Sequence, residues 1–336
     1  MTKKIVFRVF GIVLLSCLVT LNARGADEDN WIGKRVMVVK PNVNFQVSKT
    51  MVGPAPIGMV LDVTEVNGKW LKFKGKRGWI QIENVILQSK AVEHFSNLIR
   101  ANPGSEAYNQ RGVTWVAQQE YDKAIADFDE AIRRDSKNIS AFNDRGNAYR
   151  KLGKLSEALA DFNKVVASGI RHPAVYLNRG FVLHDKGDYD AALADFNLSL
   201  KVDAKFAPAW EAGGSARQAK GEYDWAISNF NKAIEVDDTF ALAYNNLAWI
   251  LATCPDDQIR DAEKAFQHGT KACELTGFQN AEFLDTLAAA HAEAGQFEQA
   301  VQHAKQALEL AKTDKKGEIA ERLKHYEENK PFREGV

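Results

Sequence analysis

Residues 141–166 read AFNDRGNAYRKLGKLSEALADFNKVV, and this stretch is one copy of a pattern that recurs every 34 residues from Ser105 to about Ala311. Each copy has a small residue in its first half: Gly112, Gly146, Gly180, Gly214 and Ala248. An aromatic residue precedes it at Tyr108, Phe142, Tyr176, Trp210 and Tyr244, and alanines (Ala124, Ala158, Ala192, Ala226) and phenylalanines (Phe128, Phe162, Phe196, Phe230) follow. A fixed 34-residue period predicts a solenoid of stacked helix–turn–helix units.

One unit shows why such a helix pair forms. Phe142, Gly146 and Tyr149 recur at i, i+4 and i+7, which places them on one face of a helix that Gly153 can end. A second helix, about residues 156–166, aligns its own apolar residues: Ala158, Leu159, Phe162 and Val165. Because one hairpin cannot bury its apolar stripe alone, the hairpins must stack.

The residues at these positions resemble the tetratricopeptide repeat (TPR) family, and the NDRGNAY and ALADFN stretches are similar to its bacterial form. Six units over residues 105–312 begin near Ser105, Ile139, Pro173, Ala207, Ala241 and Ala281. The fifth unit is stretched by residues 255–258 and has Gly269 where the phenylalanine is expected, so the next small residue is Ala288. The resemblance implies a mainly α, right-handed superhelical solenoid that serves as a scaffold and specifies no chemistry.

Residues 1–25 predict a secretory signal peptide. Lys3, Lys4 and Arg8 precede an apolar run over residues 9–21, which is shorter than the roughly 20 residues that span a bilayer. Small residues before Ala26 suit cleavage there, although lipid attachment at Cys17 and an uncleaved anchor are alternatives. We therefore expect an exported protein, periplasmic or at the cell surface, with no transmembrane span in its mature form.

Residues 26–88 have a β-type pattern: Val36, Val38, residues 59–66, Leu71, Phe73 and residues 79–82, broken by Gly58, Gly68, Gly75 and Gly78. This length suits a small five-stranded barrel. The stretches VNGKWL and GWI resemble a bacterial Src-homology-3-like (SH3-like) domain, and the whole arrangement is similar to exported planctomycete-type proteins without an assigned activity. Residues 89–104 predict a linker and capping helix, and residues 313–336 a second capping helix and tail.

A basic strand in this domain is a candidate binding patch. Alternation over residues 70–76 directs Leu71 and Phe73 inward. The side chains directed outward are Trp70, Lys72, Lys74 and Lys76, with Arg77 beside them. Such a patch suits an anionic cell-wall polymer or an acidic partner, and the alternatives are a solvated face or docking onto the acidic array. From residue 91 onward the chain has 38 acidic and 30 basic residues, which argues against nucleic acid as a ligand of the array.

No motif in the sequence indicates catalysis, a metal or a cofactor, so we predict that the protein is not an enzyme. The seven histidines are scattered, and neither a nucleophile elbow nor a phosphate-binding glycine loop occurs. Cys254 and Cys273 lie at distant ends of two antiparallel helices, beyond the ~7 Å between Cα atoms that a disulfide allows. We predict two buried free thiols.

Three arginines precede the recurring glycine, and each has an aspartate sixteen residues later: Arg111 with Asp127, Arg145 with Asp161, and Arg179 with Asp195. In the fourth unit Gly213 and Asn229 replace both residues, and in the fifth Leu247 replaces the arginine. This joint loss predicts an ion pair across each of the first three hairpins, and descent from one ancestral repeat is the alternative.

The TPR resemblance implies that the first helix of each hairpin lines a concave groove. The groove positions hold Asn109, Asn143, Asn178, Asn245 and Asn246, with Phe181 and Trp249 beside them. Asparagines can pair with the backbone of an extended peptide, and the aromatics suit apolar anchors. The alternative is that the asparagines only solvate the surface and the aromatics pack on the next hairpin.

These features predict a non-enzymatic interaction scaffold that binds an extended peptide or partner protein in the groove. Asn109 stands where the family's chaperone-binding form has lysine, so a carboxylate-terminated ligand is not favoured. The alternative function is a cell-wall-associated accessory factor or enzyme that acts through the β-barrel.

Overall fold

The computed structural model describes residues 31–40, 42–47, 50–55 and 59–335, so the expected signal peptide lies outside the described residues. The chain divides into two compact units, Met1–Ala91 and Val92–Val336. In the described ranges, no helix is both long enough and apolar enough to cross a membrane.

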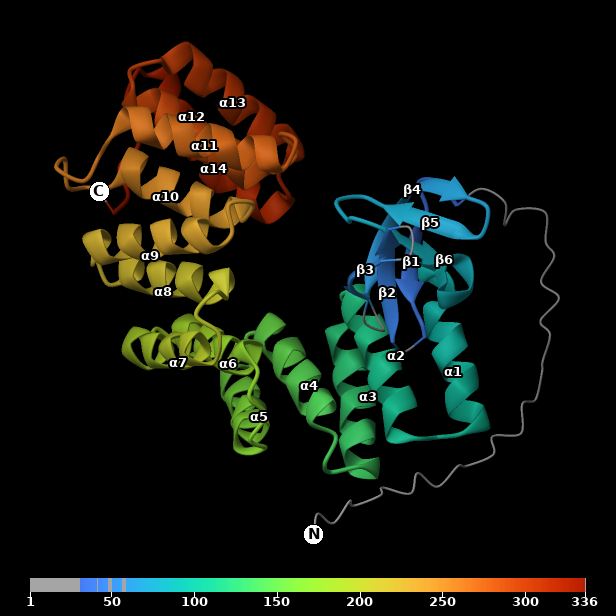
Figure 1. The fold of residues 1–336 in the computed structure, drawn as a ribbon. Helices are drawn as coiled ribbons and strands as arrows, with labels where there is room; N and C mark the ends of the chain where they lie inside the picture. The colour runs from blue at the N-terminus through green and yellow to red at the C-terminus, as the bar shows by residue number, and fades with distance from the viewer. Residues whose placement is uncertain (1–30, 41, 48–49, 56–58, 336) are drawn as a thin grey trace, which may run out of the picture. The chain divides into compact units, whose positions relative to one another are not determined.

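The first unit contains a seven-stranded antiparallel sheet in the order β3-β2-β6-β5-β4-β1-β7 (Figure 1). The strands are β1 (Arg35–Val38), β2 (Val43–Val47), β3 (Thr50–Ala55), β4 (Val60–Asn67), β5 (Trp70–Phe73), β6 (Trp79–Gln81) and β7 (Val85–Leu87). The eight-residue β4 pairs with β1 through its beginning and with β5 through its end. One long strand therefore joins two smaller ladders.

The sheet is open, so the expected closed barrel of five strands is corrected. The terminal strands β3 and β7 do not pair with each other in the described residues, and β2 meets β6 at one residue pair, Gln46 and Trp79. The expected strand over residues 70–76 ends at Phe73, because Gly75 and Gly78 turn the chain with φ of +67° and +108°.

The second unit is helical. A first helix α1 (Ala91–Ala101) precedes the hairpins and α14 (Thr313–Glu327) follows them. The first helices of the six hairpins are α2 (Ser105–Ala117), α4 (Ile139–Lys151), α6 (Pro173–Asp185), α8 (Ala207–Ala219), α10 (Ala241–Thr253) and α12 (Ala281–Glu293). The second helices are α3 (Tyr121–Arg134), α5 (Leu155–Ala167), α7 (Tyr189–Val202), α9 (Tyr223–Val236), α11 (Ala262–Leu275) and α13 (Phe297–Leu310).

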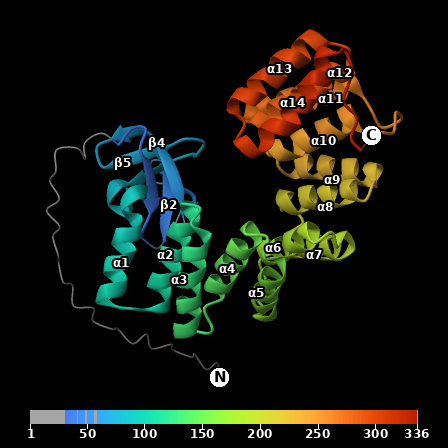
Figure 2. The same cartoon turned by 180° about the vertical axis from the view of Figure 1, so that it is seen from behind.

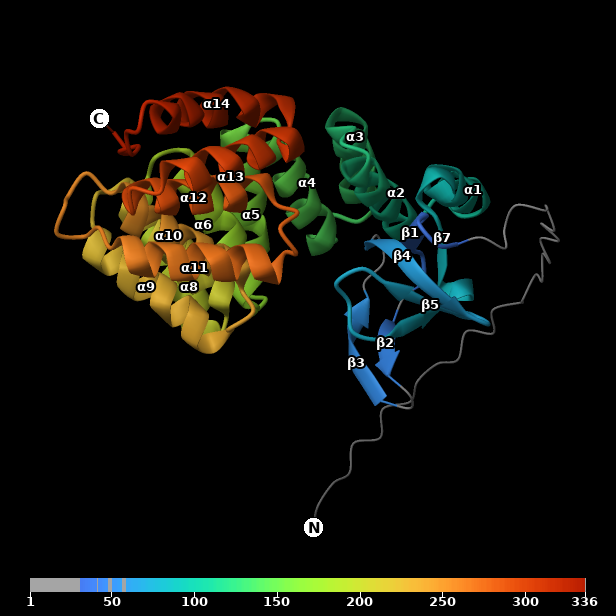
Figure 3. The ribbon, with the colours of Figure 1, turned by 90° about the horizontal axis from the view of Figure 1, so that it is seen from above.

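The hairpins stack in chain order from α2 to α13, as Figures 1 and 2 show. Each first helix packs on the second helix of its own hairpin and on that of the preceding one, and neighbouring first helices also touch. The view in Figure 3 places α14 beside α13, which it contacts. The expected mainly α solenoid is confirmed.

The recurring glycine lets the two helices of a hairpin approach closely. A Cβ added to Gly180 would lie 2.5 Å from the ring of Phe196, and one added to Gly146 would lie 3.1 Å from that of Phe162. Both phenylalanines are at most 1% exposed. In the fifth hairpin the sizes are exchanged: Ala248 faces Gly269, whose added Cβ would lie 3.7 Å from the alanine methyl group. The missing phenylalanine is therefore explained by its larger partner.

Candidate functional site on the first-helix face

The three predicted Arg–Asp pairs are confirmed, and they fix the hairpins behind the candidate site. Arg145 donates from Nε to Asp161 Oδ2 at 2.8 Å and from Nη2 to Oδ1 at 2.6 Å. The pairs in the first and third hairpins have the same two-pronged geometry, with distances of 2.6 and 2.7 Å. The aspartate side chains are 3% to 8% exposed. Each pair therefore locks a second helix to its first helix.

The remaining arginine nitrogen joins consecutive hairpins, a contact that the sequence did not reveal. Arg145 Nη1 reaches Asp129 of the preceding second helix at 2.6 Å. Arg179 Nη1 contacts Asn163 in the same way at 3.0 Å. In the fourth hairpin Asn229 covers Gly213 instead, with Nδ2 2.7 Å from the position of an added Cβ. The arginine clamp therefore ends at the third hairpin.

The first helices present one stripe of side chains, which we call the first-helix face. In α2 it contains Asn109, the fifth residue of the helix. In α4, α6, α8, α10 and α12 it contains the residues at the fifth or sixth, the ninth, and the twelfth or thirteenth helix positions. On the first three hairpins the predicted asparagines belong to one hydrogen-bond network that includes Asp144. Asn178 Nδ2 donates to Asn143 Oδ1 at 3.0 Å, and Asn143 donates to Asp144 at 3.1 Å. Asn109 also donates to Asp144, at 3.2 Å. Burial raises the pKa of Asp144 above its ordinary range, and these amide donors oppose that shift.

A second polar network lies on α8 and α10. Asn246 Nδ2 and Ser215 Oγ each donate to Glu211 Oε1 at 2.8 Å, and Asn245 donates to Asn246 at 3.2 Å. Glu211 is 6% exposed, and the loss of hydration raises its pKa to about 7. Sequence reasoning missed Asp144 and Glu211. The 34-residue register could have found Glu211, because it places this residue at the same helix position as Asn109, Asn143 and Asn245.

The two predicted aromatic anchors have partners within the chain. Phe181 meets Phe196 edge-on with ring centroids 5.7 Å apart, and the Arg150 guanidinium lies 4.9 Å from the Phe181 centroid. Trp249 lies beside Phe332 at 5.9 Å, and its Nε1 donates to Glu334 Oε2 at 3.2 Å. A segment that follows α14 therefore covers part of the predicted groove.

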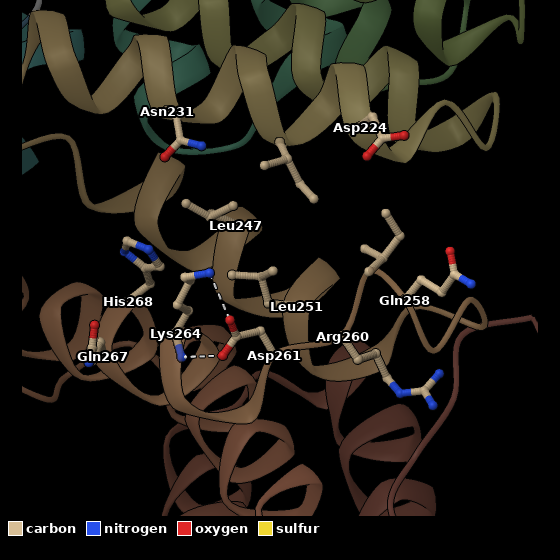
Figure 4. Close-up of a pocket in the computed structure, with 12 residues that line it drawn as sticks. Asp224, Asn231, Leu247, Leu251, Gln258, Arg260, Asp261, Lys264, Gln267 and His268 are labelled. Carbon is tan, nitrogen blue, oxygen red and sulfur yellow. Dashed lines mark hydrogen bonds and ion pairs between the residues drawn. The ribbon is translucent and has the colours of Figure 1, made fainter.

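A pocket lies on other residues, between α9, α10, α11 and the stretched loop of the fifth hairpin. Its volume is about 600 Å³, and Figure 4 shows Leu247 and Leu251 between the polar side chains of α9 and α11. Two dashed contacts in Figure 4 join Lys264 to Asp261. In one of them, Lys264 Nζ lies 2.8 Å from Asp261 Oδ2. Arg260 is likewise paired, with Glu293 at 3.0 Å. The cations at this pocket are thus neutralised by acids of the same chain.

In the first unit, the structure brings together Trp70 and Lys72 of the predicted patch. Trp79, which sequence reasoning did not include, joins them because β5 and β6 pair Lys72 with Trp79 and Trp70 with Gln81. The Lys72 ammonium lies 5.7 Å from the Trp79 centroid and 2.6 Å from Glu65 Oε1. Lys74, Lys76 and Arg77 are exposed in the turn beyond β5.

A shallow hollow of about 300 Å³ opens on this face of the sheet. It is lined by Gln46, Asn67, Trp70 and Trp79. The Gly-Trp-Ile stretch contains Trp79, and the pairing of Trp79 with Lys72 places it in the predicted patch. These two features together could have identified Trp79 as a patch residue.

The predicted thiols are confirmed as free and buried. Burial raises the pKa of Cys254 and raises that of Cys273 to about 12. Over the described ranges, no group of three or more histidine, cysteine, aspartate or glutamate residues is arranged to hold a metal ion.

Three stretches of the chain match known family profiles. Residues 112–153 match "TPR repeat", and residues 143–208 and 281–313 match "Tetratricopeptide repeat". These hairpins are tetratricopeptide repeats. The three matches leave out residues 209–280, which include most of the fourth hairpin, where the arginine clamp is absent, and the stretched fifth hairpin.

Solved structures show the same TPR fold. The Cut9–Hcn1 hetero-tetramer of the APC/C matches with a TM-score of 0.59 and 13% identity over 70% of this chain, which spans 46% of that one. A tetratricopeptide repeat protein from Parabacteroides merdae matches at 0.52 and 20% identity, with coverages of 71% and 92%. PilW, a type IV pilus biogenesis factor, matches at 0.53 and 18% identity, with coverages of 60% and 91%. A comparison with curated proteins found no match by sequence.

Proposed function

We propose that the TPR array is a non-enzymatic scaffold that binds an extended segment of a partner protein on its first-helix face. The observation that carries this proposal is the polar stripe formed by the networks around Asp144 and Glu211. Burying such groups costs free energy, whereas apolar residues at these helix positions would pack more cheaply. A stripe of fixed amides and carboxylates suits recognition of peptide backbone and polar side chains.

The experiment selects peptides from a display library with the chain lacking residues 1–25. Binding of the selected peptides is then measured for Asn143→Ala, Asn178→Ala and Trp249→Ala. Asn197→Ala is a matched control, because Asn197 is an exposed asparagine on the second helix α7. We expect at least one of the three variants to bind more weakly than the parent, and we expect the control to bind as the parent does. If all three variants are folded and bind as the parent does, the first-helix face is not the working surface.

We also propose that residues 1–25 direct export and are removed before Ala26, which rests on the basic, apolar and small-residue pattern of that stretch. Mass spectrometry of the chain recovered from a periplasmic or surface fraction tests this. A chain beginning at Ala26 is expected. A lipid-modified Cys17 or an intact first residue would contradict it.

The hollow beside Trp70 and Trp79 favours a second function, binding of an anionic cell-wall polymer by an SH3-like first unit. Two indole faces with amide neighbours suit a saccharide, and Lys72, Lys74, Lys76 and Arg77 supply positive charge nearby. Sedimentation with purified peptidoglycan should weaken for Trp70→Ala and Trp79→Ala. The control is Trp225→Ala, which removes a 62% exposed tryptophan of the array. Equal sedimentation of all variants would exclude this surface.

A further inference from the structure

The residues after α14 turn back onto the first-helix face. Asn329 has φ of +57°, and backbone hydrogen bonds from Asn329 and Lys330 to the end of α14 close the turn. Residues 331–333 have no regular secondary structure.

Three consecutive side chains of this segment meet matched partners. Phe332 lies against Trp249, and the Arg322 guanidinium is 5.6 Å from the Phe332 centroid. Arg333 Nη2 is 2.6 Å from Glu293 Oε2 at the end of α12. Aromatic and charged groups of the segment thus face aromatic and oppositely charged groups of the helices.

Glu334 makes the most polar contacts. Its carboxylate accepts hydrogen bonds from Trp249 Nε1 at 3.2 Å and from Gln218 Nε2 of α8 at 3.1 Å. Its backbone N–H donates to the carbonyl of Thr253 at 2.9 Å, a carbonyl at the open end of α10. Three residues of the segment therefore contact α8, α10 and α12, and the contacts use both backbone and side chains as a bound peptide does.

We propose that α8, α10 and α12 form a binding site for a partner segment with an aromatic residue, an arginine and a glutamate in succession, and that Phe332, Arg333 and Glu334 occupy this site within the free chain. The inference rests on the proposed function and names the ligand class of that same face. The segment is short and partly exposed, so its release costs little compared with unfolding of the array. Tethering gives it an effective concentration near millimolar, so a partner segment must displace it.

The experiment uses a fluorescein-labelled peptide with the sequence PFREG, which is residues 331–335. A chain that ends at Lys330 keeps the turn after α14 and frees the site. We expect this shortened chain to bind the peptide at least about tenfold more tightly than the full chain does. Peptides with alanine in place of the phenylalanine or the glutamate should bind the shortened chain at least about tenfold more weakly.

Trp249→Ala in the shortened chain should abolish binding, whereas the control Trp225→Ala should leave it unchanged. If the shortened chain does not fold by circular dichroism, the full chain with Phe332→Ala and Glu334→Ala provides the open site instead. Equal binding to the closed and open chains, or no binding to a folded open chain, would overturn the proposal. A full chain that is dimeric by light scattering and becomes monomeric on shortening would overturn it too, because the segment would then bridge two copies.

Failure of the inferred ligand class and failure of the proposed function give different results in these binding experiments. If library peptides lose binding to Asn143→Ala while PFREG never binds the open chain, the first-helix face remains the working surface and only the ligand class is wrong. If PFREG binds the open chain through Trp249 while no library peptide responds to the asparagine changes, the asparagine stripe is not used.

Discussion

Replacing Asp161 with alanine removes the carboxylate that holds Arg145 across the second hairpin. The guanidinium loses two hydrogen bonds, of 2.8 and 2.6 Å, while its own side chain is only 18% exposed. Water cannot fully replace the lost partner at that depth. Asp129 remains, 2.6 Å from Nη1, and its side chain is 53% exposed. The variant therefore keeps a charged arginine with one solvated partner instead of two.

These contacts set the expected magnitude. Removing one partner of a buried pair costs about 3–5 kcal/mol, and the remaining contact to Asp129 should reduce this to about 2–3 kcal/mol of unfolding free energy. The double change of Asp161→Ala with Arg145→Leu frees only Asp129, whose side chain is 53% exposed, so no buried charge is left unpaired. It should therefore destabilise less than the two single changes together, with a coupling of about 1–2 kcal/mol.

Urea unfolding followed by circular dichroism measures these differences, and hydrogen exchange locates the weakened hairpin. The control is Asp190→Ala, which removes an exposed contact of 2.7 Å to Lys220 and should cost less than about 1 kcal/mol. A cost for Asp161→Ala no larger than that of the control would refute the reasoning. Strictly additive single changes would refute it as well.

Three further outcomes are expected from the structure. Gly180→Ala should lower the urea midpoint more than Gly146→Ala, because an added Cβ meets a phenylalanine ring at 2.5 Å rather than 3.1 Å; the reverse order would contradict this packing. Because folding raises the pKa of Glu211 from 4.5 to about 7, the free energy of unfolding should fall as pH rises through that range. Above pH 7, Glu211→Gln should be roughly 3 kcal/mol more stable than the parent. Equal urea midpoints of the two proteins at pH 8 would argue against the shift. Cys254 and Cys273 should react with a thiol reagent only after unfolding, and fast labelling of the native protein would show that they are accessible.

The repeat period carried enough information to predict the helical hairpins. A residue at a fixed step meets the same surroundings in every copy, so the recurring positions of Gly146 and Phe162 indicated two apolar helices in each unit. The contact between the glycine and the ring became visible only in the structure. The joint loss of the arginine and aspartate in the fourth hairpin likewise identified the ion pairs. The sheet had no such repetition. The strand β7 has only three residues, too few for alternation to indicate it, and two glycine turns shortened β5.

The asparagine partners could not be predicted from the period, for a geometric reason. Asn109 bonds to Asp144, Asn143 to Asn178, and Glu211 to Asn246, and the partners in each pair are 35 residues apart. Neighbouring first helices are therefore displaced by about one residue along the stripe. A comparison of copies at a step of 34 aligns equivalent positions, and it does not pair a position with the next one in the following copy. The side chains that bond across the face thus belong to different columns of the repeat.

Trp249 joins the predicted site to the inferred ligand. An indole on a helix surface exposes apolar area to water unless another group covers it. The free-energy cost of that exposure was the reason to predict an anchor at Trp249. The chain meets the cost with Phe332, Arg322 and the Glu334 carboxylate, which come from residues 73 to 85 positions away and outside the repeats. A periodic pattern holds no information about a segment that occurs once. The chemistry that would attract a foreign peptide is nevertheless the chemistry that attracts this segment, so residues 332–334 describe what the face selects.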